Sequence, residues 1–218
     1  LAVFDRVVAT RPEFKKAWYL HSLQEPRVEG RTTTIRCEGP AYGGGEYGGQ
    51  LVVETLLPTA PRIEKVGGPG KECWNEVTSR NYPSGKKGRE GRVELGGWRI
   101  EVIPSRPARE DRFLHVLTVM DVGTPAPPVA AIETAEFAGA RVLDRVVLFG
   151  QGDASFSSAE LEVPGQGDAE VLAIGVPPGR WEVTTPGGRT LTLSADAHGK
   201  CVWFRTPAGR VRLRRAAG

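Results

Sequence analysis

Short runs rich in Val, Ile, Leu and Thr recur along the chain, and glycine and proline residues separate them. Between residues 97 and 105, Ile100 and Val102 fall on one face of an extended strand, since successive side chains alternate. Arg99 and Glu101 fall on the opposite face. No segment places apolar residues at the helical spacing over three turns. The pattern therefore predicts an all-β protein.

A proline-rich segment at residues 123–128 stops the strand pattern and stiffens the chain. We therefore expect a large antiparallel β-sandwich at residues 1–123 and a smaller antiparallel β-sandwich-like subdomain at residues 129–218. The strands expected in the first domain are 1–10, 17–24, 31–38, 51–57, 62–66, 71–77, 97–105 and 112–121. Those expected in the second are 130–136, 141–150, 157–163, 170–176, 180–185, 190–194, 200–205 and 210–214.

The first two expected strands are predicted to form a hairpin around the polar turn at residues 11–16. A turn symmetrical about Glu13 places Asp5 directly opposite His21 on an otherwise apolar face. Such a pair is either a hydrogen-bonded pair that satisfies a buried charge or part of a metal site. A zinc site needs at least three protein ligands, and this hairpin offers two.

Charge and composition narrow the classes of function. The 218 residues carry 29 basic and 26 acidic side chains, a net charge of +3, which does not suggest a polyanion-binding surface over the whole molecule. No apolar run reaches membrane-spanning length, and we expect no signal peptide within these residues. The three cysteines have no metal-finger spacing, and either one disulfide or three free thiols fits them. The chain opens inside a strand without Met, so we expect a fragment of a longer polypeptide or a processed chain.

Two loops are candidate carbohydrate contacts. The glycine-rich segment 39–50 is predicted to be a mobile loop, from which Tyr42 and Tyr47 could stack on sugar rings. Loop tyrosines also pack on their own domain. The polar loop at residues 79–92 offers cations for an acidic glycan, among them Lys86, Lys87 and Arg89.

Other reactive side chains have simpler explanations. His115 lies in a nearly continuous apolar strand and is predicted to be a core histidine with a hydrogen-bond partner. No nucleophile elbow or phosphate-binding loop is found. Of four well-separated tryptophans, at least three are expected in the core, whereas an exposed row would mark a carbohydrate-binding face: Trp74, Trp98, Trp181 and Trp203.

Several motifs occur in order within residues 1–121. They are VFDRV at 3–7, FKKAWYLHS at 14–22, GQL at 49–51, LLP at 56–58, VGGPGKE at 66–72, WRIEV at 98–102 and DRFLHVL at 111–117. This series resembles the second domain of heparinase II/III-type polysaccharide lyases. The remaining residues are similar to the short β-sandwich tail of such proteins.

The resemblance implies an α/α toroid followed by a large β-sandwich. Such enzymes cleave uronate-containing polysaccharides by β-elimination, with a base that removes the proton next to the carboxyl group and an acid that protonates the leaving oxygen. The base and acid lie mostly on the toroid, which nothing in this chain resembles, so we assign no catalytic residue here. Some members bind zinc through an Asp and two His; Asp5 and His21 match two of these ligands, and the third would lie before Leu1.

We therefore expect the β-sandwich region of a polysaccharide lyase that acts on uronate-containing glycans. This region would support or complete the active site, while the catalytic α/α toroid is absent from this chain. The chain alone is therefore not expected to be active. The alternatives are a non-catalytic carbohydrate-binding module and a secreted structural subunit that self-assembles. The expected partners are an acidic polysaccharide and a catalytic α/α domain or further copies of the chain, but neither nucleic acid nor membrane. We expect an extracellular or periplasmic location, and zinc as the cofactor.

Overall fold

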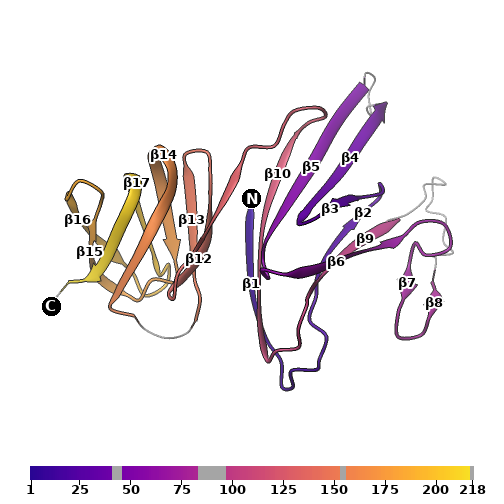
Figure 1. Ribbon diagram of the computed structural model, residues 1–218, viewed down its shortest axis with the longest axis horizontal. Helices are drawn as coiled ribbons and strands as arrows, with labels where there is room; N and C mark the ends of the chain where they lie inside the picture. The colour runs from indigo at the N-terminus through magenta and orange to yellow at the C-terminus, as the bar shows by residue number, and fades with distance from the viewer. Residues whose placement is uncertain (41–45, 83–96, 153–155, 217–218) are drawn as a thin grey trace. The chain divides into compact units, whose positions relative to one another are not determined.

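The computed structural model describes residues 1–40, 46–82, 97–152 and 156–216. The chain divides into two compact units, Leu1–Ala126 and Pro127–Gly218, and the division falls inside the proline-rich segment 123–128 (Figure 1). The described residues form strands and turns without a helix, so the predicted all-β class is confirmed. Within these ranges, no helix is long and apolar enough to cross a membrane.

The described part of the first unit contains three sheets. Its strands are β1 (Ala2–Val8), β2 (Trp18–Ser22), β3 (Arg27–Glu29), β4 (Thr32–Pro40), β5 (Glu46–Leu57), β6 (Pro61–Gly67), β7 (Trp74–Asn75), β8 (Arg80–Asn81), β9 (Trp98–Pro104) and β10 (Glu110–Asp121). The strand orders are β1-β10-β5-β4-β3, β2-β9-β6 and β7-β8.

The two larger sheets of the first unit share a hydrophobic core, which makes this unit a sandwich. Ile100 and Val102 of β9 pack in one buried cluster with Phe113 of β10. Trp18 and Ile63, from the two strands that flank β9, pack against the same cluster. The predicted alternation along residues 97–105 is therefore confirmed on its apolar side.

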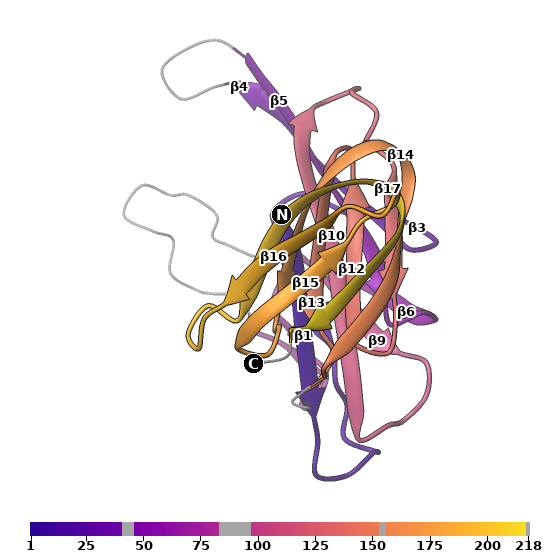
Figure 2. The ribbon, with the colours of Figure 1, turned by 90° about the vertical axis from the view of Figure 1, so that its left-hand side faces the viewer.

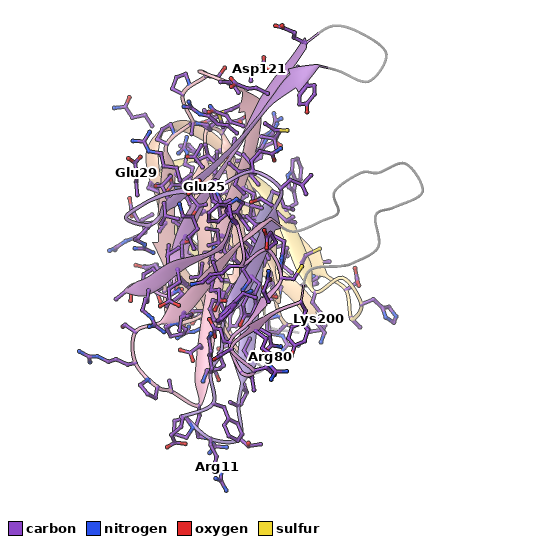
Figure 3. All side chains as sticks on the ribbon, turned by 90° about the vertical axis from the view of Figure 1, so that its right-hand side faces the viewer. Arg11, Glu25, Glu29, Arg80, Asp121 and Lys200 are labelled. Atoms are coloured by element: carbon purple, nitrogen blue, oxygen red, sulfur yellow. The ribbon has the colours of Figure 1, made fainter. Side chains whose placement is uncertain are left out.

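The predicted hairpin of the first two strands is wrong. The strand β1 pairs with β10, where Asp5 lies opposite Phe113, and β2 pairs with β9, where His21 lies opposite Arg99. The intervening turn therefore crosses from one sheet to the other, and Arg11 lies at the tip of this connection (Figure 3). A strand-turn-strand pattern is the same for a hairpin and for such a crossing. The partner strands come from much later in the chain.

The glycine-rich segment 39–50 is not all loop. The ladder between β4 and β5 continues through the pairs Glu38–Gly48 and Gly39–Tyr47, and residues 41–45 lie outside the described ranges. Backbone N–H and C=O groups form this ladder without any contribution from side chains. Glycine therefore lowers the preference for a strand here without preventing one.

The described residues of the second unit form one seven-stranded sheet in the order β11-β12-β13-β14-β17-β15-β16. Its strands are β11 (Val129–Glu133), β12 (Phe137–Val142), β13 (Arg145–Gly150), β14 (Ser158–Ile174), β15 (Gly179–Thr184), β16 (Thr190–Ala195) and β17 (Cys201–Arg215). All pairs are antiparallel except β13 with β14, which is parallel.

Three strand boundaries predicted in the second unit are wrong. The expected strand 141–150 is the end of β12 and all of β13, joined at Leu143, whose φ of 54° lies in the left-handed region. The two strands expected between 157 and 176 are the single strand β14, whose pairing with β17 shifts register between Val163 and Asp168. The strands expected at 200–205 and 210–214 are likewise continuous in β17, because a register shift bends a strand without ending it.

One face of this sheet curves around the main hydrophobic core of the unit (Figure 2). All seven strands contribute buried side chains to it, among them Phe137, Leu148 and Leu213. Trp181 is fully buried and donates a hydrogen bond from Nε1 to the Pro177 carbonyl at 2.8 Å. The expectation of at least three core tryptophans is wrong, because Trp181 is the one fully buried tryptophan among the described residues and Trp203 is 56% exposed.

The substitution Trp181→Phe tests this core. It removes buried ring atoms and leaves the Pro177 carbonyl without its donor, so we expect the free energy of unfolding to fall by about 2–4 kcal/mol. The matched change Trp203→Phe, at an exposed ring, should cost less than about 0.5 kcal/mol. Urea unfolding followed by circular dichroism measures both, and equal losses would contradict this description of the core.

Candidate functional site

The polar face of the β2-β9-β6 sheet carries a buried carboxylate. Glu101 lies on the central strand β9, where its register partners are Tyr19 on β2 and Glu64 on β6. Its exposed fraction is 0%, although its face is opposite to the one that packs in the core. The segment with β7 covers this face, since Arg99 donates a hydrogen bond to the Trp74 carbonyl at 2.6 Å.

Two cations hold the Glu101 carboxylate. Lys15 Nζ lies 2.8 Å from Oε2, and Arg99 Nε lies 2.6 Å from Oε1. Lys15 also reaches Glu76 Oε2 at 2.7 Å. Two positive and two negative charges therefore form a closed network, as burial of an ionised group requires.

The network changes the pKa values of its members. Burial raises the pKa of Glu101. The hydrogen bonds from Lys15 and Arg99 lower it by more than burial raises it, so the pKa lies below the usual range. Burial lowers the pKa of Lys15, but the hydrogen bonds to Glu101 and Glu76 outweigh it, and the result lies above the usual range. Glu101 and Lys15 are therefore charged at neutral pH.

Three carboxylates lie close together at this position, and basic side chains rather than a metal ion balance their charge. Oxygens of Glu64, Glu76 and Glu101 lie within 4.8 Å of one another. Lys15 and Arg99 already supply the compensating positive charge. The cluster thus has the character of an ion-pair network, and both Glu101 oxygens are occupied as hydrogen-bond acceptors.

The neighbouring lysine makes a second buried anchor. Lys16 is 8% exposed, and its Nζ lies 3.0 Å from Asp111 Oδ2 at the start of β10. The same ammonium donates to the carbonyls of Phe14 and Ala108. Consecutive lysines therefore bind different sheets, which fixes the crossing between β1 and β2. No sequence pattern indicates this role, because lysine is normally exposed.

The structure does not place Asp5 opposite His21. Both side chains are exposed. The register puts His21 on the same face as Arg99 and puts Asp5 on the same face as the buried Phe113, in the other sheet. Neither belongs to a group of three or more metal-ligating side chains within the described residues. Their role as zinc ligands stays a prediction that requires a third ligand from outside these ranges.

The predicted carbohydrate contacts are only partly described. Tyr42, Lys86, Lys87 and Arg89 lie outside the described residues. Tyr47 is 46% exposed on β5, and the Cys37 thiol lies 3.5 Å from its hydroxyl. Glu38 and Glu46 line the hollow beside Tyr47, so the local charge disfavours an acidic glycan at this position. Its carbohydrate role stays a prediction. All three cysteines are free thiols.

His115 is the core histidine that the apolar strand predicts. Its ring is fully buried, stacks on Trp18 with centroids 3.9 Å apart, and places Nδ1 3.2 Å from Thr55 Oγ1. Nε2 has no hydrogen-bond partner among the described residues. Burial lowers the pKa of His115 from 6.5 to about 4, so the imidazole is neutral at neutral pH.

The substitution Glu101→Gln should destabilise the first unit. It removes the charge that compensates Lys15 and Arg99 in a buried position, for which we expect a loss of about 3 kcal/mol. Glu64→Gln is the matched control, because Glu64 is more exposed and pairs with Arg62; it should cost less than about 1 kcal/mol. Chemical unfolding at neutral pH measures both, and a cost for Glu101→Gln no larger than that of the control would contradict the network.

The buried His115 predicts a loss of stability in mild acid. In the unfolded chain, His115 binds a proton below about pH 6.5, whereas in the folded chain it does so only below about pH 4. The free energy of unfolding therefore decreases as the pH falls through this interval. We expect a loss of about 2–3 kcal/mol between about pH 7 and 4.5, and His115→Phe should largely abolish it. Below this interval, protonation of Glu101 adds a further loss. An unaltered chain whose free energy of unfolding is constant over the interval would contradict this prediction.

A comparison with known protein families finds a match within the second unit. Residues 131–215 match the model of the heparinase II C-terminal domain. The match begins within β11 and ends at the last residue of β17, so it extends across the seven-stranded sheet. No curated protein matches the chain.

The match confirms the predicted kinship with heparinase II/III-type lyases, but in a different part of the chain from the motifs. The motif resemblance lies in residues 1–121, which the family model does not cover, and there it stays a prediction. The matched residues are a domain related to those of polysaccharide lyases. Within the second unit, residues 131–215 are therefore similar to the heparinase II C-terminal domain.

Proposed function

We propose that this chain is the β-sheet region of a polysaccharide lyase that acts on uronate-containing glycans by β-elimination. The observation that carries the proposal is the family match across the sheet of the second unit. The two-unit β organisation, with a sandwich before the matched domain, agrees with it. In this proposal, the first unit contacts the acidic glycan, and a catalytic α/α domain provides the chemistry.

The polar face around Glu101 supports a contact role for the first unit. The register places Tyr19 and His21 on this face, and both side chains are exposed. Their hydroxyl and imidazole groups can form hydrogen bonds with sugar hydroxyl or carboxylate oxygens. The ion pairs of Glu101 with Lys15 and Arg99 hold the strands that carry these groups in place, which lowers the cost of ordering them when a ligand binds.

Two ionisable groups of the first unit are unsuited to act as the general base. Glu101 is a poor candidate, because both of its oxygens accept hydrogen bonds from cations and its pKa is lowered. His115 is buried and cannot reach a polymer. We therefore assign the base and the acid to an α/α domain.

The proposal predicts binding without catalysis by this chain. In affinity electrophoresis, heparin and alginate in the gel should retard the chain, whereas a neutral glucan should not, because charge and hydrogen bonding select the acidic polymer. Incubation with the same polymers should give no ultraviolet absorbance from an unsaturated product. Absence of retardation by either acidic polymer would count against the proposal. Product formed by this chain alone would show that the missing base and acid lie within it.

A further inference from the structure

A hollow of about 310 Å³ lies at one end of the first unit. Its walls are the turn at residues 11–16 and the connection between β9 and β10, and Arg62 of β6 adds to the lining. Pro12, Pro104 and Pro107 form part of the walls, and each has a fixed backbone φ. Concave sites with walls that are already formed are the usual sites for small ligands.

Lys16 holds the two walls together. Its ammonium donates to the Phe14 carbonyl in the turn at 3.3 Å and to the Ala108 carbonyl in the connection. It also pairs with Asp111 at 3.0 Å. A backbone hydrogen bond from Ala9 N to Arg109 O, at 2.8 Å, links the same two segments. The width of the hollow is therefore fixed by buried interactions.

The lining suits an anion with an apolar face. Four basic and two acidic side chains line the hollow. Lys15, Lys16 and Arg62 are already paired with carboxylates. Arg106 therefore provides the positive charge for a ligand, and Glu13 can accept hydrogen bonds from the hydroxyl groups of that ligand. Arg106 is exposed and forms no hydrogen bond or ion pair with the described residues, so its guanidinium is available for a ligand. Phe14 is 52% exposed in the same lining.

These properties match one acidic sugar residue. A guanidinium binds a carboxylate or sulfate through two parallel hydrogen bonds, and the face of an aromatic ring packs on the C–H face of a sugar ring. We propose that this hollow is a subsite for one acidic sugar of the glycan, with its anionic group on Arg106 and its ring against Phe14. This assignment rests on the proposed function and gives it a location.

Calorimetric titration of the full chain with a heparin hexasaccharide tests the subsite. Arg106→Gln should weaken binding about tenfold, because a charge-assisted hydrogen bond is lost. Arg109→Gln is the matched control: it removes an exposed arginine of the same connection that does not line the hollow, and the affinity should stay close to that of the unaltered chain. Phe14→Ala should also weaken binding, and Phe14→Tyr, which keeps the ring, should restore it.

The outcomes separate the subsite from the wider proposal. Circular dichroism of each variant first establishes that it is folded. Hexasaccharide binding that neither Arg106→Gln nor Phe14→Ala weakens would overturn the subsite and leave the proposed function standing. No binding by the unaltered chain would overturn both. Equal weakening by Arg106→Gln and Arg109→Gln would show an unspecific charge effect and would also overturn the subsite.

Discussion

The contact between Lys15 and the buried Glu101 carboxylate determines how the first unit is built. A carboxylate removed from water is destabilising unless cations and hydrogen bonds compensate for it. Arg99 provides one partner from the same strand, and Lys15 must be brought to the other side from a distant part of the sequence. This requirement draws the chain after β1 away from its own sheet and places β2 next to β9.

The arrangement of the proposed site follows from the same constraint. Lys15 faces the Glu101 network, while Lys16 next to it faces Asp111 and the connection between β9 and β10. The turn is therefore held on two sides. One side presents the face with Tyr19 and His21, and the other side forms the hollow. A single short segment thus connects both surfaces that we propose to contact the glycan.

Local features of the fold were accessible from the sequence, whereas strand partners were not. The alternation in β9 correctly separates Ile100 from Glu101, because side-chain direction depends only on the strand itself. The pairing of β1 was wrong, because its partner β10 begins about a hundred residues later and the turn pattern contains no information about it. In the second unit, β14 and β17 continue through register shifts that the sequence pattern takes for turns.

The site was harder to predict than the fold. A buried lysine such as Lys16 contradicts the usual preference of that residue, and the hollow depends on segments that only the tertiary structure brings together. The prediction that Asp5 lies opposite His21 depended on the hairpin. It is wrong, because the two strands pair with different partners in different sheets. The predicted kinship with heparinase II/III-type lyases is confirmed at residues 131–215, whereas the motif resemblance in residues 1–121 stays a prediction.

Hydrogen exchange of the full chain, with and without a heparin hexasaccharide, most directly tests the claim that the first unit holds an acidic glycan. Mass spectrometry of the peptides locates any amide whose exchange slows when the ligand binds. We expect protection in peptides that cover residues 11–16 and 104–109, the two walls that Lys16 joins. Unchanged exchange in both segments, at a hexasaccharide concentration that saturates binding, would contradict the claim.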